Sequence, residues 1–299
     1  MSPGLQPFAE ALRQPAYVCV NCGFWQRFFA APRSCPMCLD ARHVVPSSGW
    51  MFHGAREAQA LYPCHYEELE TGAWRFWNDP VEGIGPNGYL LRTPHGNVAF
   101  EGCTIYSETA LAHIEALGGI RFLSASHPHA YGALWQLQDR FEPELVLNAA
   151  DFAWSSALRV TWPWDDALTL TPRFELVATG GHFAGHTVLY DAERRLTLCG
   201  DALKFELDPT DRRRATHISA HKAFVRAVPL TLAELRRYRT VFERLDFTQT
   251  WTPFEQVRNS GRAQALALID DMLAARPHAE TRLLARESAA AANFAAAAT

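Results

Sequence analysis

The sequence has no long hydrophobic run and little excess charge of either sign. No apolar stretch approaches the roughly 20 residues that a membrane-spanning helix needs, and residues 1–6 lack the basic segment and apolar stretch of a secretory signal. The 28 lysines and arginines are balanced by 32 aspartates and glutamates, which gives a net charge of −4. Because a nucleic-acid-binding protein usually carries a clustered basic face, we expect neither a nucleic-acid nor a membrane partner. We expect a cytoplasmic protein that acts on a small-molecule substrate.

Cysteine is scarce, and most of it lies in one motif. Four of the seven cysteines form two Cys-x2-Cys pairs, Cys19/Cys22 and Cys35/Cys38, separated by 12 residues. Each pair fits a tight knuckle whose two thiolates point at one ion, so that two knuckles supply a tetrahedron of sulfurs. The other three cysteines are scattered, as is usual in a reducing compartment. The spacing predicts a small metal-binding ribbon.

The residues around these pairs resemble the short rubredoxin-like ribbon found at the end of rubrerythrins. The segments that carry the resemblance are 17–23 and 35–38. Four thiolates bind zinc and iron in similar geometry, so zinc is the default expectation and iron stays open. A module of this size has little core and needs its ion to fold. We also expect that the ribbon can mediate contact with a protein partner.

The sequence divides into three regions. The breaker cluster Pro46–Gly49 predicts a linker, which separates a ribbon module at 1–47 from a larger domain at 48–285. The alanine-rich segment 286–299 is expected to be a frayed terminal helix or a disordered tail. The larger domain alternates strand-like and helix-like segments, which indicates an α/β protein. The predicted strands are 88–93, 96–100, 120–125, 144–148, 174–178, 187–190, 196–199 and 247–252, and the predicted helices are 109–117, 231–245 and 261–275.

Histidines follow several of these strands in a recognisable order. His127-Pro128-His129 follows the strand 120–125. Residues i and i+2 of an extended segment point the same way, so both rings can bind one ion, and Pro128 restricts its own φ. A lone His-x-His is most often a structural pair. The interpretation changes because His182 lies in a glycine-rich turn after a strand and Asp201 ends another strand.

The combination of His-Pro-His, Gly-His-x-x-Gly-His-Thr and Cys-Gly-Asp resembles the metallo-β-lactamase superfamily. The resemblance covers about 50–275 and implies a four-layer αββα sandwich with a metal at one edge of its two sheets. It implies that His127, His129 and His182 bind one metal, and that Asp201 is a fourth ligand or the partner of a bound water. The layout with the ribbon first also resembles uncharacterised metallo-β-lactamase-fold proteins that carry an N-terminal zinc ribbon.

The departures from the family all concern a second metal. Tyr131 and Gly132 stand where two-metal members place Asp and His, and Thr252 lies in the segment 250–254, where the last histidine is expected. Three losses from one site, with the other site intact, predict a degenerate centre that binds one ion.

Four further residues are weaker candidates for the site. Tyr131 either fills the space of the second metal or orients the substrate and donates a proton. His186 is expected to be a structural or supporting histidine beside the ligands. His217 and His221 lie in a polar loop that can fold over the site and supply a ligand.

These residues lead to three functional hypotheses for a chain whose substrate the sequence does not name. The first is a mononuclear metal-dependent hydrolase, because zinc with three histidines and an open position lowers the pKa of water to about 7; Asp201 then orients or deprotonates that water. The second is a non-haem iron redox enzyme, since two histidines and a carboxylate resemble the facial triad of iron oxygenases, and persulfide dioxygenases build an iron site on this fold. The third is a non-catalytic metal-binding protein with a vestigial site.

Overall fold

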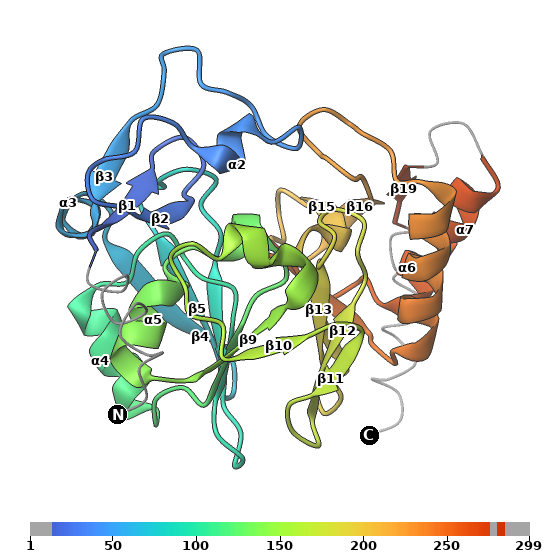
Figure 1. The fold of residues 1–299 in the computed structure, drawn as a ribbon. Helices are drawn as coiled ribbons and strands as arrows, with labels where there is room; N and C mark the ends of the chain where they lie inside the picture. The colour runs from blue at the N-terminus through green and yellow to red at the C-terminus, as the bar shows by residue number, and fades with distance from the viewer. Residues whose placement is uncertain (1–13, 276–279, 285–299) are drawn as a thin grey trace.

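The computed structural model describes residues 14–275 and 280–284, and the predicted tail 286–299 lies outside them. Two β-sheets pack face to face and helices cover both outer faces (Figure 1). The first sheet has the strand order β10-β9-β8-β7-β6-β5-β4 and the second has the order β11-β12-β13-β14-β17-β18. The strands of the first sheet are β4 (Cys64–Glu70), β5 (Ala73–Asn78), β6 (Gly88–Leu91), β7 (Val98–Phe100), β8 (Phe122–Ser124), β9 (Glu144–Asn148) and β10 (Trp162–Trp164). Those of the second are β11 (Ala167–Thr169), β12 (Phe174–Ala178), β13 (Thr187–Asp191), β14 (Leu196–Leu198), β17 (Gln249–Trp251) and β18 (Gln256–Val257).

Alternation along the strands produces the layers. In β6, Tyr89 and Leu91 belong to the core between the two sheets, whereas Leu90 belongs to the core under the helices of the first sheet. In β12, Leu176 faces the inter-sheet core and Val177 faces the helices of the second sheet. Successive side chains of a strand point to opposite faces, so one run of apolar residues supplies two cores.

Four helices complete the sandwich. α4 (Glu108–Ala116) and α5 (Leu134–Phe141) contribute to the core of the first sheet, and α6 (Leu232–Arg244) and α7 (Arg262–Leu273) to that of the second. A capping box begins α6: Glu234 N–H donates to Thr231 Oγ1, and Thr231 N–H donates to Glu234 Oε2. This box satisfies two of the backbone donors that a helix N-terminus leaves free. The predicted four-layer αββα architecture is confirmed.

The ribbon lies at one edge of the sandwich, at the top of Figure 1. Its sheet contains β1 (Ala16–Cys19), β2 (Trp25–Arg27) and β3 (Phe52–Gly54), and its short helix is α2 (Pro36–Leu39). The third strand, β3, lies beyond the predicted module boundary at residue 47 and leads directly into α3 (Ala55–Leu61). The ribbon is therefore continuous with the larger domain through a shared strand.

A second small sheet lies beside the second large one. It contains β15 (Lys204–Leu207), β16 (Ala215–Ser219) and β19 (Thr281–Leu283). In the part of the chain that the structure describes, no helix combines the length and the apolar character needed to cross a bilayer.

Candidate metal centre

The four ribbon cysteines converge on one point. The Sγ atoms of Cys19 and Cys38 lie 3.7 Å apart, and those of Cys22 and Cys35 lie 3.6 Å apart. All four ligand atoms lie within 4.8 Å of one another. Two sulfurs bound at roughly 2.3 Å to one tetrahedral ion lie about 3.8 Å apart. The cluster therefore has the dimensions of a four-thiolate metal site.

A second cluster forms at the edge of the two sheets. His127 and His129 follow β8, His182 lies in the turn between β12 and β13, and Asp201 follows β14. Their ligand atoms all lie within 4.8 Å of one another. These segments are far apart in sequence, and the sandwich brings their ends to one place.

The separations fit one bound ion. His182 Nε2 lies 3.2 Å from His129 Nδ1, and Asp201 Oδ2 lies 3.6 Å from His182 Nε2 and 3.7 Å from His127 Nε2. Two nitrogen ligands at roughly 2.0–2.1 Å from one tetrahedral ion lie about 3.3 Å apart. Within the described residues, the buried His127 Nε2 has no hydrogen-bond partner, as expected of a ligand atom directed at a metal. The donor set of three imidazoles and one carboxylate suits zinc or iron.

The backbone that pairs the first two histidines differs from the prediction. His127 is extended, with φ −165° and ψ 167°, but Pro128–Ala130 forms a 3₁₀ turn. The prediction that both histidines lie on one extended segment is wrong. Proline suits the first position of such a turn because its φ is already helical. The turn brings the ring centroids of His127 and His129 to 5.4 Å from each other.

Hydrogen bonds fix which nitrogen of His127 and of His182 faces the cluster. Ser126 Oγ donates to the buried carboxylate of Glu101 at 2.5 Å and lies 2.7 Å from His127 Nδ1. Burial raises the pKa of Glu101 to about 8. With Glu101 ionised, the serine proton is used in this bond, and Ser126 Oγ accepts from His127 Nδ1. His182 Nδ1 lies 2.7 Å from the carbonyl oxygen of Lys222, to which it donates. Both rings therefore present an unprotonated Nε2, and such partners orient metal ligands in proteins.

Burial sets the charge of the cluster. Desolvation holds the pKa of His127 and His129 well below the usual value, and lowers the pKa of His182 to about 4. Burial also raises the pKa of Asp201 to about 6, opposed by the positive charge of Lys204. At neutral pH the rings are uncharged and the carboxylate is largely ionised, which is the protonation state that a cation requires.

His186 supports the cluster without pointing at it. Its Nε2 accepts from the backbone N–H of Asp201 at 3.2 Å, and its Nδ1 lies 2.6 Å from Thr179 Oγ1. The ring stacks on that of His127 with the centroids 5.2 Å apart. His186 thus contacts His127 and Asp201, and its supporting role stays a prediction.

The cluster opens into a cavity of about 320 Å³. Arg42 and His43 of the ribbon form part of its wall, and Lys204 and Phe254 lie on the larger domain. The Lys204 ammonium lies 5.4 Å from the Phe224 ring and 5.9 Å from the Phe254 ring. The cavity lining is Arg42, His43, Ile84, His129, His182, Asp201, Lys204, Phe224, Val225 and Phe254.

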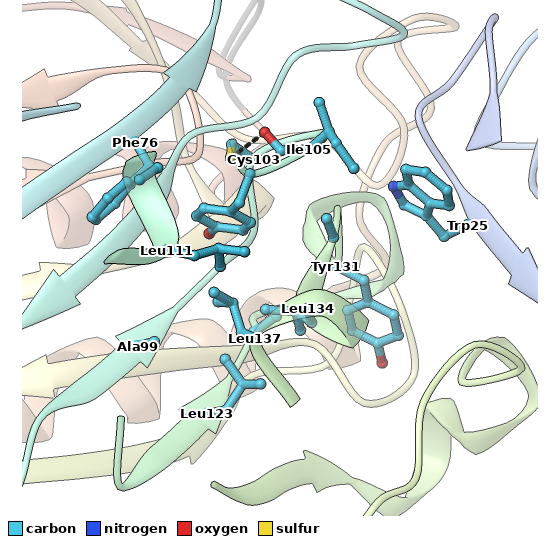
Figure 2. Packing of buried hydrophobic residues seen from close by; sticks show 14 of the residues in the cluster. Trp25, Phe76, Ala99, Cys103, Ile105, Leu111, Leu123, Tyr131, Leu134 and Leu137 are labelled. Carbon is cyan, nitrogen blue, oxygen red and sulfur yellow. Dashed lines mark hydrogen bonds between the residues drawn. The ribbon is translucent and has the colours of Figure 1, made fainter. Parts of the chain in front are cut away.

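Tyr131 does not join the cluster. Its side chain is 5% exposed and belongs to the hydrophobic core that includes Trp25 and Leu134, as Figure 2 shows. Burial raises the pKa of its phenol well above the usual value. The geometry gives no support to a catalytic role for Tyr131, which stays a prediction.

The other two candidates, His217 and His221, also lie outside the cluster, and the prediction that His217 lies in a loop is wrong. His217, on β16, has its Nδ1 3.1 Å from Glu206 Oε2. The His221 ring contacts Phe224, which lines the cavity. This loop does reach the cluster, but through the backbone carbonyl of Lys222.

The places of the missing ligands are filled by other groups. Gly132 has a φ of 43°, and a Cβ there would overlap the carbonyl oxygens of Gly102 and Cys103. No side chain fits at this position unless the backbone moves. In the other segment, Thr252 Oγ1 donates to Glu255, and burial raises the pKa of that carboxyl to about 7.

The sequence was compared with protein families and with curated proteins. No protein-family model matches the chain. The sequence is 24% identical over 258 residues to the uncharacterized protein YmaE of Bacillus subtilis (strain 168), an alignment that covers 81% of this chain and 90% of YmaE.

Similar solved structures are metallo-β-lactamases. DIM-1 metallo-β-lactamase superposes with a TM-score of 0.53 at 12% identity, covering 70% of this chain and 97% of DIM-1. FIM-1 from Pseudomonas aeruginosa, in its mono-zinc form, has a TM-score of 0.50 at 13% identity, covering 72% of this chain and 97% of FIM-1. The chain therefore has the metallo-β-lactamase fold, and a four-cysteine cluster that suits a zinc ribbon precedes it.

Proposed function

We propose that this protein is a mononuclear metal-dependent hydrolase that acts on a small molecule. The observation that carries the proposal is the convergence of three imidazoles and one carboxylate, with ligand atoms within 4.8 Å of one another. His129, His182 and Asp201 of this cluster line a cavity. A cluster of neutral histidines with an ionised carboxylate in a cavity is typical of a catalytic metal site.

The chain supplies the parts that this chemistry needs. A bound zinc ion supplies Lewis-acid chemistry and lowers the pKa of water to about 7. His127, His129 and His182 would hold the ion. Asp201, which is partly exposed at the cavity, would bind it or accept a proton from the attacking water. His186 holds the Asp201 backbone by accepting from its N–H, which fixes the carboxylate relative to the rings.

The cavity favours a substrate with apolar and anionic parts. Ile84, Phe224 and Phe254 supply apolar wall, and Lys204 supplies a cation at the same opening. A cation near an apolar wall favours a molecule that pairs an acyl or ring group with an anionic group. The volume, about 320 Å³, restricts the reacting part to a small molecule.

A single ion is favoured by the packing around the second position. Tyr131 lies in the core with Trp25, and Gly132 is closed in by backbone. Neither position offers a ligand atom to a second ion. The proposal is therefore one ion in the histidine site and one in the ribbon.

The test is hydrolysis by the purified protein across ester, thioester, lactam and phosphodiester substrates. We expect turnover with at least one class. In Asp201→Asn we expect a loss of about 10²–10⁴-fold in kcat, the contribution of a positioned acid or base. His217→Ala changes a histidine outside the cluster and serves as the matched control, with unchanged kcat. Full activity in both Asp201→Asn and His127→Ala would remove this mechanism.

One observation favours a second candidate, a non-haem iron redox enzyme. The ribbon and the histidine site adjoin: the ring centroids of His43 and His129 lie 5.6 Å apart. Two metal sites this close suit electron transfer between a rubredoxin-like ion and a mononuclear iron. Iron in elemental analysis, with visible absorbance that dithionite bleaches, would support this candidate over the hydrolase.

A further inference from the structure

The end of the ribbon reaches the histidine site. The cysteine ligand Cys38 lies in α2, and Cys35 immediately precedes that helix. Asp40 follows α2, and two residues later Arg42 and His43 enter the cavity wall. Only a few residues of chain therefore separate the ribbon ligands from the wall of the second site.

Arg42 joins the two sites through one planar group. Its Nε and Nη2 donate to the two carboxylate oxygens of Asp40 at 2.6 and 2.7 Å, and its Nη1 donates to the carbonyl oxygen of His182 at 2.9 Å. The guanidinium also lies over the Phe183 ring, 3.7 Å from its centroid. Arginine is suited to such simultaneous bidentate and stacking contacts.

Phe183 makes a second connection. It follows the ligand His182 in sequence, yet it is 1% exposed inside the ribbon core with Cys22, Cys38 and Met37. A residue of the larger domain thus completes the ribbon core. When the ribbon loses its order, the turn that carries His182 loses the packing of Phe183 and the hydrogen bond from Arg42 together.

We propose that the ribbon is required for metal binding at the histidine site. Arg42 is the residue that positions the turn carrying His182, and the cysteine-bound ion is needed for the histidines to bind their own metal. The proposal rests on the metal centre proposed above and not on hydrolysis. A four-thiolate module this small is ordered only with its ion, so ribbon loading determines whether Arg42 and Phe183 hold His182. By linkage, binding at either site then strengthens binding at the other.

The direct test is Co²⁺ titration of protein whose ribbon already holds zinc, followed by the absorbance of cobalt in the histidine site. In Arg42→Ala we expect the Kd to rise about 10–100-fold, the usual cost of losing a group that orients a ligand. Arg42→Lys keeps the charge but not the planar contacts, and we expect it to restore only part of the affinity. Arg33→Ala removes an exposed ribbon arginine and should leave the Kd unchanged.

A second arm removes the ribbon ion. In Cys35→Ser/Cys38→Ser we expect the cobalt Kd to rise at least as far as in Arg42→Ala. The proposal is overturned if the cobalt Kd of Arg42→Ala stays within about twofold of the parent value, even when the variant melts at a lower temperature. Loss of an orienting contact should raise the Kd about tenfold or more. It is also overturned if the ribbon-free variant binds cobalt as tightly as the parent. Neither readout requires turnover, so failure of the hydrolase proposal stays distinguishable.

Discussion

Ser126 Oγ lies 2.7 Å from Nδ1 of the neighbouring His127, and the serine proton is donated to buried Glu101. With Glu101 ionised, this arrangement keeps the proton of His127 on Nδ1 and leaves Nε2 free for an ion. A carboxylate, a hydroxyl and an imidazole in series keep the ligand nitrogen unprotonated and directed at the cluster.

Removing the serine hydroxyl should weaken the histidine site alone. In Ser126→Ala we expect the zinc Kd of that site to rise about 10–100-fold, while the ribbon keeps its ion. Competition with a chromophoric chelator measures both sites. The matched control is Ser124→Ala, which loses a buried hydroxyl that donates to Val146 O at 2.6 Å. Equal loss of affinity in the two variants would show that His127 does not depend on Ser126.

Metal affinity at the histidine site should fall in acid in two stages. Protons compete for Asp201, whose pKa burial raises to about 6, and later for His182, whose pKa it lowers to about 4. Both groups bind the ion only when deprotonated. Affinity should therefore fall about tenfold per pH unit below pH 6 and fall more steeply below pH 4. In Asp201→Asn the stage near pH 6 should vanish, and cobalt titration at several pH values measures it. A fall that begins near pH 6 in that variant would contradict the assignment.

Tyr131→Phe separates packing from catalysis. The ring is buried among apolar side chains, so we expect kcat to change by less than about twofold, against the 100-fold or more expected for a lost proton donor. Tyr131→Ala should instead destabilise the fold by about 3–5 kcal/mol, as truncation of a buried aromatic does. Steady-state kinetics and urea unfolding distinguish the two effects. A large loss of kcat in a stable Tyr131→Phe variant would restore the catalytic role.

The tight packing at Gly132 can be measured by comparison with Gly119, a glycine in more open surroundings. Gly132 and Gly119 both have positive φ, but a Cβ at Gly119 meets only Phe141, at an ordinary 3.6 Å. We expect Gly119→Ala to cost about 1 kcal/mol of unfolding free energy from backbone strain. Gly132→Ala should cost a further 1–3 kcal/mol or so from overpacking against Gly102. Equal costs would mean that position 132 has room for a side chain.

Much of the fold was predictable because its signals are local. The helix predicted at 231–245 is observed as α6, which begins at the capping box of Thr231 and Glu234, and the apolar strands 144–148 and 174–178 are observed as predicted. The amphipathic helix α5 was missed, because it is short and its N-cap residue, Ala133, provides no side-chain capping signal.

The site was predictable only in part. Its four metal-binding candidates each belong to a motif, and the structure brings them together. Arg42, Glu101 and the carbonyl of Lys222 have no such signal, because their roles arise from contacts between distant segments. The 3₁₀ turn at Pro128–Ala130 was also missed, since proline is compatible with extended and helical backbone alike.

The most direct test is elemental analysis of protein purified without added metal, performed on the parent chain and on His127→Ala/His182→Ala. We predict two ions per parent chain, one in the ribbon and one in the histidine site, and one ion per chain in the double variant. A single ion in both proteins, or three ions in the parent, would contradict the account of one ion held by three imidazoles and Asp201.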